Sequence, residues 1–151
     1  MNLSLRILKV KDVSQSYIDW FKIPEVIRYS ENQYRLFSLD SQKDFVNSCL
    51  KKEGVDLYGI FDNNLHIGNI QINDFDSIHK RAEITYVVGD TNYWCRGVGS
   101  FAVSKIIQLS KKKYFLNKLY AGVDKRNLSS IKVLEKNGFI LEGIRKKHLY
   151  F

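Results

Sequence analysis

Two glycines separated by one residue, Gly97 and Gly99, mark the segment of this sequence best suited to bind an anion. They stand in residues 86–100, whose pattern reads as a strand, a loop and the start of a helix. Glycine lets consecutive backbone N–H groups converge on an anion, and a helix start adds unpaired N–H groups and the positive end of a dipole. Arg96 can add a charge-assisted contact. The expected chemistry is phosphate binding at a helix N-terminus.

A glycine pair of this kind is often only a turn, so the known nucleotide motifs must be compared with it. No Gly-Lys-Ser/Thr follows the pair, which excludes a P-loop. The third glycine of a dinucleotide-binding fingerprint is replaced by Ala102, and no clear acidic ribose ligand ends the next predicted strand. The glycine pair alone therefore does not identify a binding site, and other parts of the sequence must be considered with it.

The positive charge of the chain is concentrated in its last third. The formal net charge is +8, but residues 1–100 carry 12 Lys/Arg against 13 Asp/Glu, a net of −1. Residues 101–151 carry 12 Lys/Arg against 3 Asp/Glu, a net of +9. Such a patch fits a nucleic acid or a polyanionic cofactor, or it is a solvated surface that serves no partner.

Composition predicts one folded domain, residues 1–151, in a reducing cytoplasm. The hydrophobic content of 44% is ample for a single core, and 26% charged residues argue against disorder. No apolar run approaches the roughly 20 residues of a membrane span, and the N-terminus lacks the pattern of a signal peptide. Cys49 and Cys95 lack metal-ligand spacing and the three histidines are scattered, so no metal site is expected.

Hydrophobic periodicity and turn signals predict a mixed sheet with helices. Ser14 suits an N-cap, and Pro24, the single proline, opens a short helix. The expected strands are residues 3–7, 55–61, 65–72, 81–88, 118–123 and 139–142, with a further start at 147–151; the expected helices are residues 14–22, 25–29, 41–52, 100–114 and 128–137. An antiparallel meander followed by a β-α-β crossover predicts the α/β (α+β) class, with a mostly antiparallel central sheet and helices on both faces.

A second motif near the C-terminus gives the glycine loop its context. It consists of Asn127 at a predicted helix start, Gly138-Phe139 about a dozen residues later, and Glu142-Gly143. Together the loop and this motif resemble the GNAT superfamily, within it the branch of ribosomal-protein alanine N-acetyltransferases and related amino-sugar and polyamine acetyltransferases. The resemblance covers nearly the whole chain. It implies a GNAT-like fold, acetyl-CoA as acetyl donor and a primary amine as acceptor.

The resemblance also implies which residues contact acetyl-CoA. The family's pyrophosphate loop falls on residues 94–99, the strand end before it pairs with the pantetheine arm, and a helix-start Asn bonds the cofactor. The expected contacts are Val87, Val88, Trp94, Cys95, Arg96, Gly97, Val98, Gly99, Ser100, Asn127 and Ser130, with Arg126, Lys132 and Lys136 as the nearest further cations. Trp94 stands where the family usually has Gln or Arg, and Cys95 where it often has Gly. Asn127 also suits a helix N-cap, and both roles can hold together.

Acyl transfer to an amine requires a base, because an alkylammonium with a pKa of about 10.4 is protonated at neutral pH. Glu83 lies inside an apolar β run, where a charged residue needs a reason, and this branch of the family often places its base there. Asp74 and Asp76 in the preceding loop are the runners-up. Alternatively, Glu83 faces solvent or pairs with Arg81 or Lys80.

The oxyanion and the leaving thiolate need other groups. The backbone N–H of Val87 or Val88 would stabilise the oxyanion. Many family members place a Tyr in the helix before Gly-Phe to protonate the thiolate, and the matching residue here is Leu134. Tyr86 or Tyr120 could take its place, and a thiol with a pKa of about 8.5 also leaves without help. Tyr86 is the second catalytic candidate.

The acceptor is the least determined part of the prediction. The N-terminal helices build the acceptor pocket in this fold, and Trp20, Phe21, Tyr29 and Tyr34 give it aromatic character unless these rings belong to the core. The first hypothesis is a small amine such as an amino-sugar nucleotide. The second is N-terminal acetylation of a protein, and the third is a non-catalytic CoA- or nucleic-acid-binding module.

The last residues predict self-association. Leu149, Tyr150 and Phe151 form an apolar, β-prone tail that a monomer would struggle to hide, and a two-fold partner commonly covers such an edge. We therefore expect a homodimer, with acetyl-CoA and an amine as its other partners, and neither a nucleic acid nor a membrane.

Overall fold

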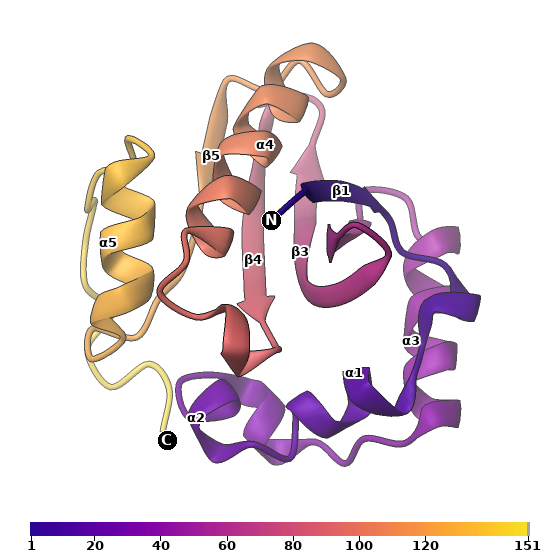
Figure 1. Ribbon diagram of the computed structural model, residues 1–151. Coiled ribbons are helices and arrows are strands. Elements are labelled where there is room, and N and C mark those ends of the chain that lie inside the picture. Colours follow the sequence, from indigo (N-terminus) through magenta and orange to yellow (C-terminus); the bar gives the residue numbers. More distant parts are fainter. Residues whose placement is uncertain (151) are drawn as a thin grey trace.

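A computed structural model describes residues 1–150 and contains one five-stranded sheet (Figure 1). The strands lie side by side in the order β1 (Leu3–Ile7), β2 (Asp56–Asp62), β3 (Leu65–Asp76), β4 (Arg81–Val88) and β5 (Lys118–Tyr120). The first four pair antiparallel, whereas β5 runs parallel to β4. The predicted class, a mostly antiparallel mixed sheet with helices, is confirmed.

The helices begin where the local capping chemistry predicts. They are α1 (Gln15–Trp20), α2 (Pro24–Ile27), α3 (Leu39–Lys51), α4 (Val98–Lys112) and α5 (Leu128–Lys136), with 3-10 turns η1 (Val10–Asp12), η2 (Glu31–Tyr34) and η3 (Thr91–Tyr93). The oxygen of Ser14 accepts a hydrogen bond from the N–H of Tyr17 at 3.2 Å, as expected of an N-cap. α3 begins earlier than predicted because Ser38 and Ser41 form a reciprocal capping box.

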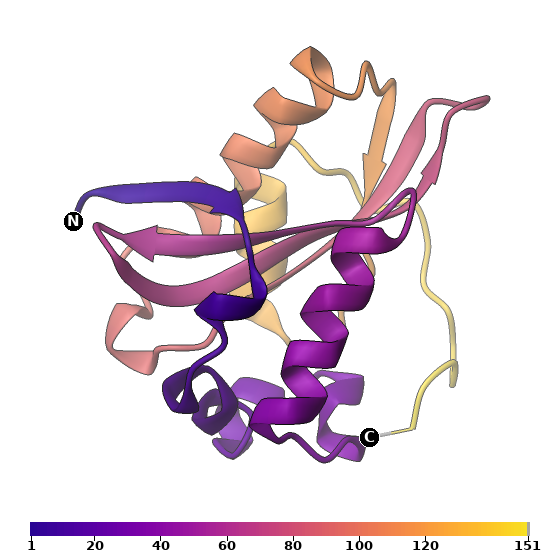
Figure 2. The same cartoon turned by 90° about the vertical axis from the view of Figure 1, so that its right-hand side faces the viewer.

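Two hydrophobic clusters hold the sheet between its helices (Figures 1 and 2). On the side of α4 and α5, the buried residues include Ile84 of β4 and Val103 of α4. On the side of α1 and α3, they include Tyr17, Ile18 and Val46. Burying an aliphatic or aromatic side chain stabilises a fold by about 1.5–3 kcal/mol, so both clusters fix the position of the strands that carry the candidate site.

Two of the four aromatic candidates for the acceptor pocket belong to the core. Trp20 is 4% exposed and Phe21 is 8% exposed, and both pack in the cluster of α1 and α3. Tyr34 is 61% exposed and Tyr29 is partly exposed. The aromatic character proposed for the acceptor side therefore rests on Tyr29 and Tyr34.

Residues 139–150 form no strand, so the strands predicted at 139–142 and 147–151 are wrong for all the residues described. Gly138, with φ at +88°, turns the chain away from α5, and Ile140 and Leu141 are 85% and 75% exposed. A β-prone sequence becomes a strand only where a neighbouring strand pairs with it, and the edge strand β5 already ends at Tyr120. Phe151 lies outside the described residues, and the homodimer stays a prediction.

A close contact between Gly89 and Trp20 holds the end of β4. A Cβ atom at Gly89 would lie 2.0 Å from the indole. The indole cannot retreat easily, because its ring centre lies 4.8 Å from that of His66 and 5.0 Å from that of Tyr17. We expect Gly89→Ala to lower the free energy of unfolding by about 1–3 kcal/mol, the usual cost of overpacking a core. Urea denaturation measures this loss.

Gly143→Ala is the matched control, because a Cβ atom there meets no neighbour within 4 Å. Its free energy of unfolding should stay within about 0.5 kcal/mol of the unmodified protein. Equal denaturation midpoints for the two variants would show that a Cβ atom at position 89 fits against Trp20 without a loss of stability.

Candidate active site

β4 and β5 separate soon after they begin, which leaves one edge of β4 open (Figure 1). Their parallel pairing covers three residues of each strand and ends at Glu83 and Tyr120. β4 then continues to Val88, whereas β5 ends at Tyr120. Backbone N–H and C=O groups along such an edge can pair with an extended ligand as a further strand would. The pantetheine arm of acetyl-CoA is predicted to pair with the end of β4 along this edge.

The glycine loop has the backbone conformation that an anion site needs. Gly97 takes the left-handed conformation, with φ at +81°, and no side chain caps the first N–H groups of the 15-residue helix α4. Cys95 is also left-handed, with φ at +58°, so the chain turns on both sides of Arg96. The exposed Arg96 guanidinium lies 5.0 Å from the ring centre of Tyr93. The loop thus presents free N–H groups and a cation together.

Trp94 makes a contact that sequence reasoning missed. Its indole N–H donates a hydrogen bond of 2.8 Å to the carbonyl oxygen of Val88, and its side chain remains 39% exposed. One of the backbone groups expected to meet the cofactor therefore already has a partner. An extended ligand that uses this carbonyl must displace the indole; one that pairs with the rest of the open edge need not.

Tyr86 lies beneath the starts of α4 and α5. A Cβ atom at Gly99 would lie 3.2 Å from the Tyr86 ring, so the two helices can approach the strand here only with glycine or a small shift. Burial raises the pKa of the Tyr86 hydroxyl, and Ser130 nearby opposes this rise. The buried hydroxyl has no well-aligned hydrogen-bond partner among the described residues. Such a group is costly to leave unpaired, so it is suited to contact a bound ligand.

Asn127 and Ser100 both make structural hydrogen bonds. The Oδ1 atom of Asn127 accepts from the N–H of Ser130 at 3.3 Å, so the alternative role of N-cap is present. The Nδ2 atom of Asn137 donates to Ser100 Oγ at 3.1 Å and joins the end of α5 to the start of α4. Asn137 precedes Gly138, a pattern that indicates a helix end but gives no sign of this second contact.

Glu83 is a partly buried carboxylate on β4, at the last residue pair before the strands separate. Its carboxylate lies close to the backbone of Gly122, where a Cβ atom would lie 3.7 Å from Glu83 Oε1. Burial raises the pKa of this carboxyl, with a further rise from Asp74, against the lowering effects of Arg145 and of Gly122. A base with a raised pKa is matched to proton transfer closer to neutral pH.

Asp74 and Asp76, the alternative candidates for the base, differ from Glu83 in their surroundings. Asp76 accepts the N–H groups of Ile78 and His79 at 3.0 and 2.9 Å and pairs with Arg81 at 3.5 Å. Asp74 is exposed and lies near the end of β3, not in a loop as predicted. Among the described residues, Glu83 forms no ion pair within 4 Å, so the expected alternative of pairing with Arg81 or Lys80 does not occur.

The three further cations predicted near the cofactor, all at or near α5, differ in whether their charge is already paired. Arg126 is held by Asp124, with contacts of 2.8 and 3.0 Å, and its guanidinium lies 5.4 Å from the ring centre of Tyr29. Lys132 and Lys136 are exposed on α5. Arg126 thus links the start of α5 to the turn that follows α2, and the two lysines are available to an anionic ligand.

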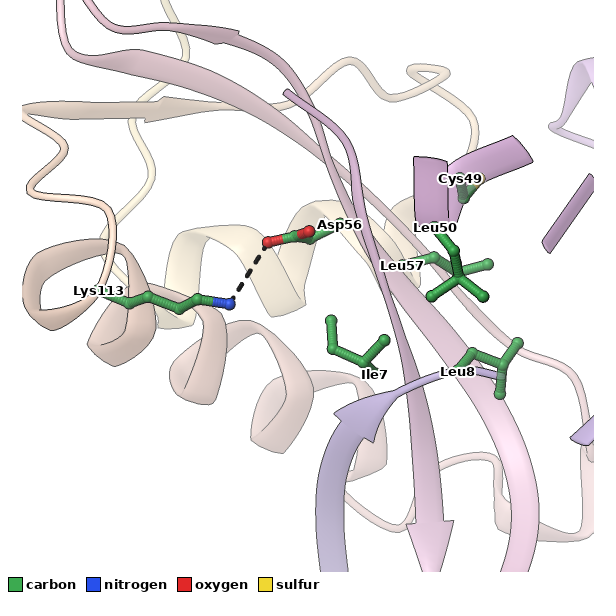
Figure 3. A pocket seen from close by; sticks show the side chains of 7 residues that line it. All are labelled: Ile7, Leu8, Cys49, Leu50, Asp56, Leu57 and Lys113. Atoms are coloured by element: carbon green, nitrogen blue, oxygen red, sulfur yellow. Dashed lines mark ion pairs between the residues drawn. The ribbon is translucent and has the colours of Figure 1, made fainter. Parts of the chain in front are cut away.

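One cavity of about 240 Å³ lies away from this arrangement (Figure 3). Its lining consists of Ile7, Leu8, Cys49, Leu50, Asp56, Leu57 and Lys113. Lys113 and Asp56 lie 3.6 Å apart, and the Tyr114 hydroxyl also donates to Asp56. Its charges satisfy each other, and none of the predicted site residues lines it.

Residues 1–150 hold neither a metal-binding group of side chains nor a membrane-spanning helix. No group of three or more His, Cys, Asp or Glu side chains there could hold a metal ion. No helix in this range is long and apolar enough to cross a membrane.

A model of the acetyltransferase (GNAT) domain matches residues 2–140. The chain belongs to the GNAT family. The N-acetyltransferase p20 of Bacillus licheniformis is 37% identical over 82 residues, 54% of this chain and 46% of that protein. The N-acetyltransferase YoaA of Bacillus subtilis (strain 168) is 31% identical over 84 residues, 56% of this chain and 47% of that protein. The match spans about half the length of each relative.

Solved GNAT structures share the fold at low sequence identity. The spermidine N-acetyltransferase of Vibrio cholerae in complex with CoA and spermine has a TM-score of 0.82 at 19% identity, over 94% of this chain and 83% of that chain. A chimera of SpeG from Vibrio cholerae and hSSAT has a TM-score of 0.86 at 20% identity, over 100% and 88% of the two chains. These likenesses establish the architecture.

This GNAT chain departs from the usual pattern at Leu134. The side chain is 7% exposed in the core cluster of α4 and α5, and its carbonyl oxygen accepts the N–H of Phe139 at 3.0 Å. An apolar residue packs where many family members present a phenol. The Tyr86 ring packs instead against Gly99 at the start of α4, and its hydroxyl is buried.

Proposed function

We propose that this chain transfers the acetyl group of acetyl-CoA to the primary amine of a small molecule, such as an amino-sugar nucleotide, by direct attack of the amine. The observation that carries the proposal is Glu83, a partly buried carboxylate with a raised pKa where β4 leaves β5. It stands beside the open edge of β4 that leads to the glycine loop. A base, a strand edge and an anion site thus follow one another along the chain.

The residues fit acetyl-CoA in three respects. The N–H groups at Gly97 and the start of α4 suit its phosphates, and the open edge of β4 suits its extended pantetheine arm. The buried hydroxyl of Tyr86, which Ser130 influences, belongs to a ring that packs against Gly99 of the loop. The phosphates of acetyl-CoA also give the excess of positive charge in residues 101–151, to which Lys132 and Lys136 contribute, an anionic partner.

The roles of the remaining residues follow from the reaction. Glu83 accepts a proton from the acceptor ammonium, directly or through water, so that its nitrogen can attack the thioester carbonyl carbon. The N–H groups of Val87 or Val88 stabilise the negative oxygen of the tetrahedral intermediate. As the carbon–sulfur bond breaks, the Tyr86 hydroxyl can donate a proton to the thiolate. These assignments leave Leu134 in the core.

A thiol-release assay with acetyl-CoA tests the proposal across amines, amino-sugar nucleotides and peptides. We expect release with a small amine and an acetylated amine of the corresponding mass. Release with peptides alone would assign the chain to protein N-terminal acetylation. Binding of acetyl-CoA without release on any acceptor would overturn the proposed catalysis.

A further inference from the structure

Three uncharged polar side chains lie beside Glu83 on the same face of the sheet. In the pairing of β3 with β4, Asn73 lies opposite Glu83 and Gln71 lies opposite Thr85. Directly opposed residues of an antiparallel pair place their side chains on one face, and so do residues two apart along a strand. Gln71, Asn73 and Thr85, here called the polar platform, therefore share a face with the candidate base.

The polar platform faces the side of α1 and α3 (Figure 2) but is not part of the core. Ile72 and Ile84 alternate with its members along the two strands, and both pack on the opposite face, in the cluster of α4 and α5. Asn69, the next residue on the platform's own face, donates to the hydroxyl of the buried Tyr17 at 2.7 Å. The two amides of the platform are only partly buried, and its hydroxyl is exposed. A polar row thus leads out of the core toward Glu83.

The polar platform keeps most of its hydrogen-bonding capacity for a ligand. The Nδ2 atom of Asn73 donates to Thr85 Oγ1 at 3.2 Å, and the three side chains form no other hydrogen bond among residues 1–150. The hydroxyl hydrogen of Thr85, the Oδ1 atom of Asn73 and the whole amide of Gln71 remain available there. Donors and acceptors together match a hydroxyl group, which both donates and accepts, whereas an ammonium group only donates.

An acceptor whose amine contacts Glu83 can also reach the platform. Opposed side chains of an antiparallel pair have Cβ atoms about 4.5–5.5 Å apart, so Asn73 is an immediate neighbour of Glu83. Thr85 follows Glu83 on the same face at roughly 7 Å along the strand. A sugar ring or a short amino alcohol covers such spans. None of the three platform side chains carries a charge that could pair with a second ammonium group.

We propose that Gln71, Asn73 and Thr85 bind hydroxyl groups of the acceptor while Glu83 takes the proton of its amine. The acceptor class is then amines with hydroxyl groups on the carbon atoms beside the amine carbon, as in amino sugars. The inference rests on the proposed function and narrows it, because it names the groups that select the acceptor. An alkyl polyamine presents methylene groups to the platform and leaves the platform's polar atoms unpaired, which weakens binding.

Calorimetry on the CoA-loaded protein compares amines that differ only in hydroxyl groups. Serinol is compared with isopropylamine and 2-aminocyclohexanol with cyclohexylamine. Spermidine serves as the polycation, which the nearby carboxylate of Asp74 would favour. We expect at least one hydroxyl-bearing amine to bind roughly tenfold or more tightly than its plain twin, the scale of one or two hydrogen bonds. The twins also differ in ammonium pKa, but this difference is the same for every protein variant.

The variants at Thr85 therefore decide the cause of the preference. Thr85→Val keeps the shape of the side chain and suits an exposed strand position, but it removes the hydroxyl, so it should reduce the preference by roughly threefold or more. Thr85→Ser keeps the hydroxyl and should retain the preference. Equal affinities within both pairs, tighter binding of spermidine than of both hydroxyl-bearing amines, or the same preference in the two variants would each overturn the inference.

Thiol release with the same acceptors separates this inference from the proposed function. Thr85→Val should raise the KM of a hydroxyl-bearing acceptor more than that of its plain twin, whereas a general disturbance of β4 would affect both twins alike. Equal turnover of the twins would refute the role of the platform and leave the acetyltransferase in place. Selective binding of hydroxyl-bearing amines without any release would refute the catalysis and support the platform.

Discussion

Replacing Glu83 with glutamine should lower kcat by roughly 100-fold or more at neutral pH while acetyl-CoA affinity stays close to that of the unmodified protein. The amide keeps the size of the side chain and an oxygen beside the backbone of Gly122, but it cannot take a proton. The fold should not suffer. Burial and Asp74 raise the pKa of this carboxyl, so the folded state does not favour its charge, and a neutral amide costs no stability at neutral pH.

The pH dependence gives the sharper test. A base works when deprotonated, so kcat/KM of the unmodified protein should rise with pH through the raised pKa of Glu83, and Glu83→Gln should lose that rise. Asp74→Asn is the matched control: it removes a nearby carboxylate that raises the pKa of Glu83, so it should keep turnover and move the rise to lower pH. Full turnover in Glu83→Gln would transfer the role of base to another group or to water.

Short-range chemistry accounts for what could be predicted from the sequence. Ser14 and Pro24 mark helix starts through interactions with their nearest neighbours, and both predictions are confirmed. The pair Gly97 and Gly99 predicts a loop that enters a helix, and α4 does begin at Val98, directly after Gly97. Periodicity predicts β4 with its observed bounds, Arg81–Val88, and with them the place of Glu83 on that strand.

What could not be predicted depends on the path of the loops and on contacts between residues far apart in the chain. The indole of Trp94 reaches Val88 because of the path of the loop, which no local pattern encodes. The tail after Gly138 has strand-forming side chains but no strand beside it. Arg145 reads as one of three consecutive cations, and no local pattern predicts that it lowers the pKa of the Glu83 carboxyl, which lies 62 residues earlier in the chain.

The glycine loop allows an equally large test. We expect Gly99→Glu to weaken acetyl-CoA binding by roughly 100-fold or more in calorimetry, because it brings a negative charge to the first turn of α4, where like charges in contact cost several kcal/mol. Its Cβ atom would also lie 3.2 Å from the Tyr86 ring, which adds a steric cost. Gly99→Ala carries the steric cost alone, so its smaller loss of affinity measures that part.

Two further variants keep this prediction decisive. Gln108→Glu makes the same change of charge on an exposed position of α4, about 14 Å along the helix, and should bind acetyl-CoA almost as the unmodified protein does. Arg96 is exposed in the glycine loop, so Arg96→Glu should leave the fold intact. It should therefore weaken binding through its charge alone, even if Gly99→Glu disturbs the fold. If acetyl-CoA binds Gly99→Glu and Arg96→Glu as tightly as Gln108→Glu, the phosphates do not lie at the start of α4, and the positive charge of the last third of the chain serves another partner.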